Sequence, residues 1–151
     1  MTNLNEKEMV SFCGLYCESC PMYTREISKT AEKLAQLTAV SGFEQMAEFV
    51  PEMAWYTDFK KRLEWFKNDV VCDQCRGENK GCHFHPDCEL HQCCLEKKVD
   101  FCFNCPDYPC AVFEEFKNQA PYFEENLQKI REMGVEDYIK TQMIQDLPED
   151  L

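Results

Sequence analysis

Apolar residues recur at helical spacing through residues 22–67. The pattern predicts a helix over residues 22–40 that ends at Ser41-Gly42, and a second helix that runs from Phe43 to Pro51. A third helix carries a stripe of large side chains at i, i+4, i+8 and i+11, namely Trp55, Phe59, Leu63 and Phe66. Such a stripe is typical of core packing, so we expect it to be buried.

Apolar residues recur at helical spacing again in residues 111–147. A helix is expected from Ala111, and Pro121 is suited to the first turn of another. That second helix has an apolar stripe of Phe123, Leu127, Ile130 and Met133, and Gly134 is placed to terminate it. Residues 136–145 are expected to form the last helix, with Tyr138, Ile139 and Met143 facing inward.

Residues 72–110 interrupt the helical pattern with nine of the twelve cysteines and all three histidines. The lack of periodicity predicts loops held by metal, with one or two helical turns between Leu90 and Val99 and a short strand at 99–103. We therefore predict one domain over residues 1–151, of the α+β class and mostly helical. A small cysteine-rich module of residues 13–21 and 72–110, resembling a zinc ribbon or knuckle, would lie at its centre, flanked by the helical parts 22–67 and 111–147.

The spacing of the cysteines favours metal binding. A C-x2-C pair places two sulfurs on one tight turn, and four thiolates satisfy a tetrahedral Zn²⁺. The candidate ligands are Cys13, Cys17, Cys20, Cys72, Cys75, Cys82, Cys88, Cys93, Cys102, Cys105 and Cys110. Cys94 adjoins Cys93, and neighbouring residues rarely bind one ion together, so we expect it to be a free thiol.

The simplest grouping of these ligands places the two C-x2-C pairs, Cys72/Cys75 and Cys102/Cys105, on one zinc. A second ion would take Cys82, Cys88 and Cys93 with His85 or His91, and a third would take Cys13, Cys17, Cys20 and Cys110. The order of cysteines along a chain does not determine which of them share an ion, so other groupings stay open.

Two other chemistries remain open. Cys13, Cys17 and Cys20 have the C-x3-C-x2-C spacing that can hold a [4Fe–4S] cluster for electron transfer or sensing. A site with three protein ligands and one water would instead suit a zinc enzyme. Nucleotide-binding glycine motifs and a G-x-S-x-G nucleophile motif are both missing from the sequence.

The net charge of −12 argues against nucleic acid and anionic lipid as partners. The sequence has no apolar run long enough to cross a membrane and no pattern typical of a signal peptide. We therefore expect a cytoplasmic protein with reduced thiols, whose partner is another protein or a small molecule.

Several motifs together resemble a family of small cysteine-rich bacterial and archaeal proteins of unknown function. They are CGLYCESCP at 13–21, CDQCR at 72–76, Cys88 and Cys93 followed by Leu95-Glu96-Lys97, the C-x2-C-x4-C run that ends in Tyr108-Pro109-Cys110, and REMGVEDY at 131–138. Gln74 stands where the family often has glycine, and Cys94 is outside its pattern. The resemblance implies metal binding, with zinc as the expected ion, and no established activity.

Overall fold

The computed structural model describes residues 6–76, 81–83, 85–120 and 122–145. Within these ranges the chain is built from helices. The α-helices are α1 (Glu26–Val40), α2 (Phe43–Phe49), α3 (Tyr56–Asn68), α4 (Glu89–Lys97), α5 (Ala111–Gln119), α6 (Tyr122–Met133) and α7 (Val135–Gln145), and the short 3-10 helices are η1 (Glu6–Met9), η2 (Cys17–Ser19), η3 (Pro51–Met53) and η4 (Cys102–Asn104).

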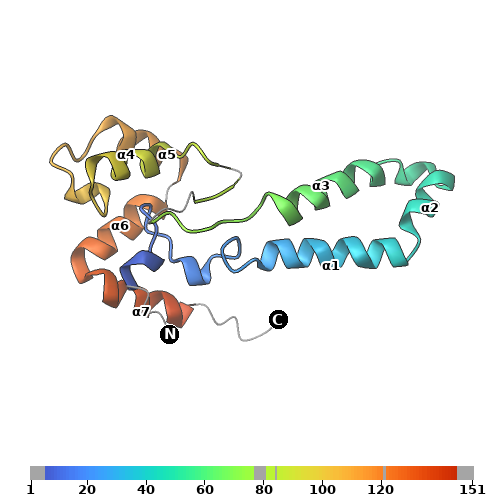
Figure 1. Ribbon diagram of the computed structural model, residues 1–151, viewed down its shortest axis with the longest axis horizontal. Helices are drawn as coiled ribbons and strands as arrows, with labels where there is room; N and C mark the ends of the chain where they lie inside the picture. Colours follow the sequence, from blue (N-terminus) through green and yellow to red (C-terminus); the bar gives the residue numbers. More distant parts are fainter. Residues whose placement is uncertain (1–5, 77–80, 84, 121, 146–151) are drawn as a thin grey trace.

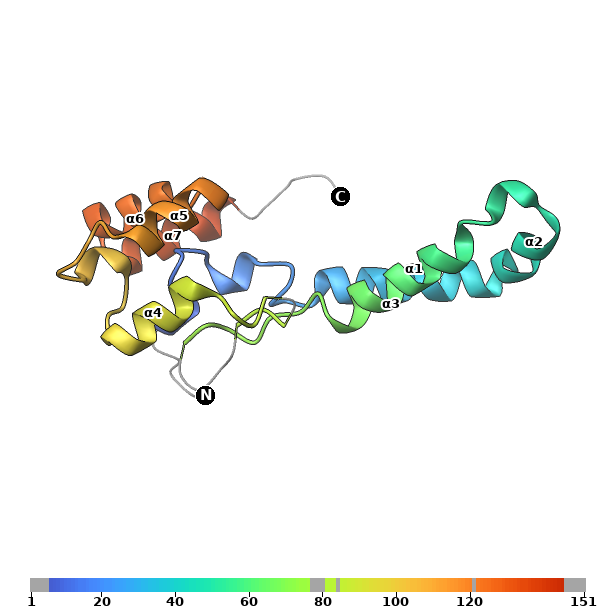
Figure 2. The same ribbon diagram turned by 90° about the horizontal axis from the view of Figure 1, so that it is seen from above.

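Helices α1 and α3 lie side by side and form an arm that projects from the rest of the molecule, with α2 and η3 at its far end (Figures 1 and 2). The inner faces of the arm bury Ala31, Tyr56 and Leu63. At its base, Ser28 Oγ donates a hydrogen bond of 2.6 Å to the carbonyl of Lys67.

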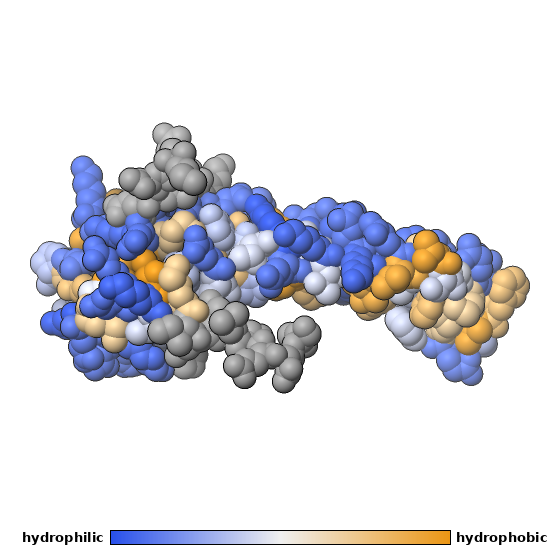
Figure 3. Space-filling view, turned by 90° about the horizontal axis from the view of Figure 1, so that it is seen from below, coloured by the Kyte–Doolittle hydropathy of each residue, from blue (hydrophilic) through white to orange (hydrophobic). Residues whose placement is uncertain are grey.

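Much of the apolar surface of the arm is exposed. The exposed fractions are 83% for Val40 and 81% for Phe49, and apolar residues gather at the end of the arm in Figure 3. The predicted core stripe of α3 is therefore only partly correct: Leu63 is buried, whereas Trp55 is 54% and Phe66 is 41% exposed. An arm of two main helices covers one face of each, so the remaining apolar positions face solvent.

The body contains η1 and helices α4–α7, which share one apolar core (Figure 1). Its largest fully buried side chains are Tyr138, Phe113, Phe123, Leu90 and Val10. Helix α7 is tied to the N-terminal loop by the Tyr138 hydroxyl, which donates a hydrogen bond of 2.6 Å to the carbonyl of Gly14. This loop brings Cys13 and Cys17 against the body.

The predicted α+β class is wrong, and so is the module resembling a zinc ribbon. In the described residues, β-pairing is limited to two isolated bridges, Val10 with Tyr16 and Cys72 with Cys82, and no sheet forms. Gln74 and Gly81, next to the second bridge, have positive φ angles that a regular strand does not adopt, and the amide of Gly81 donates to the carbonyl of Gln74 at 2.7 Å. The strand expected at 99–103 contains the start of the 3-10 helix η4 instead.

The helices predicted on both sides of the cysteine-rich stretch are confirmed, and α4 is longer than the one or two turns expected there. Pro121 and residues 146–147, which the predicted helical part included, lie outside the described residues. None of the helices in the described part combines the length and apolar content needed to cross a bilayer.

Candidate metal centre

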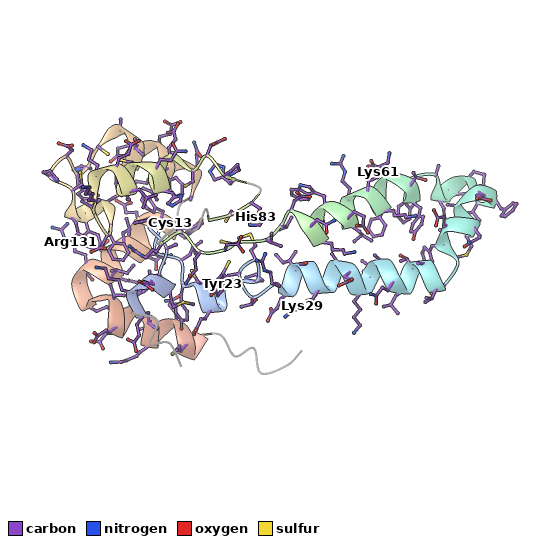
Figure 4. All side chains as sticks on the ribbon, in the orientation of Figure 1. Cys13, Tyr23, Lys29, Lys61, His83 and Arg131 are labelled. Atoms are coloured by element: carbon purple, nitrogen blue, oxygen red, sulfur yellow. The ribbon has the colours of Figure 1, made fainter. Side chains whose placement is uncertain are left out.

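The twelve cysteines, all free thiols, fall into two groups according to their strongest electrostatic interactions. The seven-thiol group consists of Cys13, Cys17, Cys20, Cys72, Cys75, Cys82 and Cys88. The five-thiol group consists of Cys93, Cys94, Cys102, Cys105 and Cys110. Figure 4 shows Cys13 and His83, which belong to the segments that form the seven-thiol group, where the body meets the arm.

Within the seven-thiol group, the isolated bridge places Cys72 directly opposite Cys82. The amide of His83 donates to the carbonyl of Val71 at 3.0 Å, and that of Asp73 donates to the carbonyl of Gly81 at 3.1 Å. This pattern makes Cys72 and Cys82 a non-hydrogen-bonded antiparallel pair, the arrangement that brings opposite side chains closest. Their thiols also share a hydrogen bond, which lowers the pKa of Cys72 and raises that of Cys82.

Two C-x2-C pairs form matching turns. The amide of Cys20 donates to the carbonyl of Cys17 at 3.0 Å, and the amide of Cys105 donates to the carbonyl of Cys102 at 2.9 Å. Each turn contains a short 3-10 helix, η2 or η4. The pair Cys72/Cys75 differs, because Gln74 has a positive φ of 73° and Cys72 is bridged to Cys82.

Burial disfavours ionisation of the free thiols in the seven-thiol group. It raises the pKa of Cys17 to about 12, and repulsion from Cys72, Cys20 and Cys13 adds to the effect. Burial also raises the pKa of Cys13 and of Cys75, and the charge of Cys88 raises both further. A buried cation, whether a metal ion or a side chain, would offset this repulsion.

Arg76 supplies one such charge, and its role was missed at the sequence level although it directly follows a C-x2-C pair. Its guanidinium lies between the rings of Phe12 and Phe101, 4.5 and 4.8 Å from their centroids. It donates hydrogen bonds to the carbonyls of Val10 at 2.6 Å and Asp100 at 2.8 Å. Because it interacts with Cys17 and Cys75 in one group and Cys94 in the other, it stabilises negative charge in both.

The five-thiol group joins α4 to the loop before α5. Cys93 interacts with Cys110, Cys102 and Cys105. Cys94, expected to be free, is 1% exposed, and its thiol is hydrogen-bonded with that of Cys102, so its pKa is raised and that of Cys102 is lowered.

The structure groups the predicted ligands differently from the simplest grouping. Cys72 and Cys75 interact with Cys17, whereas Cys102 and Cys105 interact with Cys93. The sequence could not indicate this arrangement, because it depends on the bridge at Cys82 and on the fold of the N-terminal loop. Cys13, Cys17 and Cys20 do lie together as expected, although Cys110 belongs to the other group.

The three histidines have different surroundings. His83 is exposed and pairs with Asp73, which also pairs with Arg25. His85 is exposed as well. His91 is buried in α4, and its Nε2 atom has no hydrogen-bond partner.

Among the described residues, no three His, Cys, Asp or Glu side chains converge closely enough to hold an ion. The chemistry of the donor set still fits zinc, because each thiol group supplies at least four soft ligands from nearby turns. The orphaned nitrogen of His91 is a further donor of the kind that zinc accepts.

Comparison with known proteins identifies a family for this chain, and the description of that family names no activity. No curated protein and no solved structure matches the chain. Residues 9–115, which contain all twelve cysteines, match the family described as "Protein of unknown function (DUF3795)". Because this match covers more than half of its residues, the chain belongs to the DUF3795 family.

Proposed function

We propose that this protein binds zinc through its clustered cysteines and that the metal has a structural role. Cys17, Cys20, Cys72 and Cys82 would hold one ion. Cys93, Cys102, Cys105 and Cys110 would hold a second. Both sets are complete with four protein ligands, so neither leaves the open position that a catalytic zinc needs.

The observation that carries the proposal is that thiols distant in the sequence gather in space. In the first set, Cys17 interacts with Cys20 and Cys72, and Cys82 interacts with Cys72 and Cys20. A reduced thiol gains little from this crowding, because burial and mutual repulsion oppose its ionisation. Coordination would favour ionisation of the thiols instead, since Zn²⁺ binds the thiolate form and neutralises part of its charge.

The thiols of the second set also lie near one another, within a smaller part of the fold. Cys93 on α4 interacts with Cys102, Cys105 and Cys110. Arg76 interacts with members of both groups. Four thiolates on one Zn²⁺ carry a net charge of about −2, so a buried guanidinium beside them is favourable.

Metal analysis of the full chain, purified without air, tests the proposal. We expect at least two zinc ions per chain by elemental analysis and native mass spectrometry, and no visible colour. Cys72→Ala should lose one ion and unfold at a lower temperature, because zinc binding supplies folding free energy on the order of 10 kcal/mol per site.

Cys94→Ser is the matched control, since it removes a buried thiol that the proposal leaves without metal and keeps a hydrogen-bonding group beside Cys102. It should keep its full zinc content. A chain with no metal, or a Cys72→Ala variant with full metal content and unchanged melting, would overturn the proposal. Iron with a brown chromophore would replace it by the [4Fe–4S] alternative at Cys13, Cys17 and Cys20.

A further inference from the structure

Helix α1 has an apolar side next to the face that it packs against α3. Ala31 and Thr38 are buried on its inner face. Leu34 is 40% and Leu37 is 52% exposed. At about 100° per residue, both leucines lie on one side of the line that joins the buried positions.

Helix α3 has the same arrangement. Tyr56 and Leu63 are buried on its inner face, and the exposed side chains of Trp55 and Phe66 lie on one side of that line. Phe59 is half-buried on the same side, with its ring centroid 5.5 Å from that of Trp55.

The apolar sides of the two helices belong to one face of the arm. Glu32 and Lys67 each lie on the other side of their helix, and they meet in an ion pair of 3.9 Å that marks the opposite face. Figure 3 shows hydrophobic residues along one edge of the arm and at its end, and mostly hydrophilic residues along the other edge. The apolar arm face consists of Leu34, Leu37, Trp55, Phe59 and Phe66.

The distribution of charge favours a second copy of this chain as the molecule that covers this face. The arm, residues 26–68, has six basic and seven acidic residues and therefore a net charge of −1. The remaining residues carry −11 of the total of −12. Two bodies would repel each other, whereas two arms would not, and an antiparallel arrangement of the arms keeps the bodies at opposite ends.

The apolar positions on α1 suit such an arrangement. In a dimer with two-fold symmetry, a residue i that meets residue j of the second copy is itself met by i through j. Leu34 would therefore meet Leu37 of the second copy if the axis passed midway between them. Because the Ser28 hydroxyl is hydrogen-bonded to the carbonyl of Lys67, this midpoint lies about level with residue 60 of the antiparallel helix α3.

The positions on α3 are symmetric about the same level. Trp55 and Phe66 lie at nearly equal distances along the chain from residue 60, so each would meet the other in the second copy. Asp58 and Arg62 also lie symmetrically about residue 60, and both are well exposed in an ion pair of 3.5 Å within the helix. In the dimer, Arg62 of each copy would meet Asp58 of the other.

We propose that the apolar arm face binds the same face of a second copy in antiparallel orientation, so that the two arms form a four-helix bundle. Each face consists of two helices about 20 Å long and about 10 Å wide, which gives a footprint of about 400 Å² per copy. A standard stable complex buries about 800 Å² per partner, so we expect a reversible dimer. The inference goes beyond the proposed zinc binding and does not depend on it.

Sedimentation velocity of the full chain over a range of micromolar concentrations tests the proposal. The wild type should change from monomer to dimer as its concentration rises. Leu37→Glu should stay monomeric over the same range, because the dimer would bury an unpaired carboxylate in each copy. The residue is exposed in the monomer, so the variant should melt like the wild type by circular dichroism.

Gln36→Glu is the matched control, because it adds the same charge at the neighbouring position of α1. Gln36 is exposed and lies one turn from Glu32, on the opposite face of the arm. This variant should dimerise like the wild type.

A charge exchange tests the antiparallel pairing itself. Asp58→Lys and Arg62→Glu each place like charges together at both crossings of the dimer, so each variant alone should dimerise about tenfold more weakly. An equimolar mixture of the two should associate again, because opposite charges then meet at both crossings.

A wild type that stays monomeric at every concentration would overturn the proposal and leave the apolar arm face to a different protein. A Leu37→Glu variant that dimerises normally would show that copies associate through another surface. No recovery in the mixture would exclude the antiparallel pairing. None of these substitutions changes a cysteine, so all variants should keep the zinc content of the wild type whatever their oligomeric state.

Discussion

Gly14 shows how one residue of the CGLYC motif serves packing. It has a φ of +80° in a tight turn, where its amide donates to the carbonyl of Ser11 at 3.0 Å. A Cβ at this position would lie 2.7 Å from the Cβ of Asn126 on α6. Gly14→Ala should therefore lower the free energy of unfolding in two ways, by about 1 kcal/mol of backbone strain and by about 1–3 kcal/mol from the clash.

Gly134→Ala carries the backbone strain without the clash, so the difference between the two variants measures the clash. Gly134 has a similar φ of +84°, and an added Cβ would meet nothing within 4 Å. Chemical denaturation of both metal-saturated variants should show a clearly larger loss for Gly14→Ala. Equal losses would mean that the contact with α6 can relax, and that only the left-handed backbone requires glycine at position 14.

At the level of elements, the docking of α7 predicts a loss of stability at alkaline pH. Burial raises the pKa of Tyr138 to about 12, and the charge of Cys13 adds to the shift. The phenol of an unfolded chain has a pKa of about 10. The folded state therefore retains the proton between these values, so this stabilisation is complete below about pH 10 and is lost as pH rises toward 12.

Tyr138→Phe tests this reasoning. At neutral pH it should cost about 1 kcal/mol, because the hydrogen bond to the carbonyl of Gly14 is removed. Between pH 10 and 12 the wild type should lose up to about 1.4 kcal/mol per pH unit more than the variant. Parallel denaturation curves for the two proteins across this range would show that Tyr138 titrates normally in the fold.

The positions of the helices could largely be predicted from the sequence, but which of their faces are buried could not. Helical spacing located α1, α3 and α6, because a period of 3.6 residues is a local property. The same spacing shows which positions share a face but cannot show whether another element covers it, so Phe66 is exposed while Leu127 is buried. The cysteine-rich stretch lacked a period, and its apparent strand at 99–103 reflected apolar content alone.

The sequence names the cysteines as candidate ligands but does not show which of them lie near one another. Of the two C-x2-C pairs expected to form tight turns, Cys102/Cys105 does so and Cys72/Cys75 does not, whereas Cys17–Cys20 forms a turn like that of Cys102–Cys105. The pairing of Cys72 with Cys82 and the burial of His91 both depend on contacts between distant segments. No spacing along the chain encodes such contacts.

At the scale of the whole molecule, the proposed site formed by Cys17, Cys20, Cys72 and Cys82 lies where the chain enters and leaves the arm. The arm begins at Glu26 and ends at Asn68, so Cys20 precedes it and Cys72 follows it. Apart from the packing of α1 on α3, the described contacts that join the two ends at its base include the ion pair of Arg25 with Asp73. Both of its side chains are partly exposed, so this pair contributes about 1 kcal/mol or less.

A zinc ion shared by the two segments would therefore link the base of the arm more strongly than this ion pair does, in addition to the hydrogen bonds by which Arg76 holds the second segment to the body. Chelation of zinc from the reduced full chain should increase hydrogen exchange first at residues 13–25 and 69–76. Helices α6 and α7 should keep their protection longer, because Phe123, Leu127 and Tyr138 are fully buried by apolar contacts in the body core. Mass-spectrometric exchange on zinc-loaded and chelated protein measures the difference. A uniform increase along the chain would instead mean that the metal supports the whole body, and no change at residues 13–25 would mean that it does not anchor the arm.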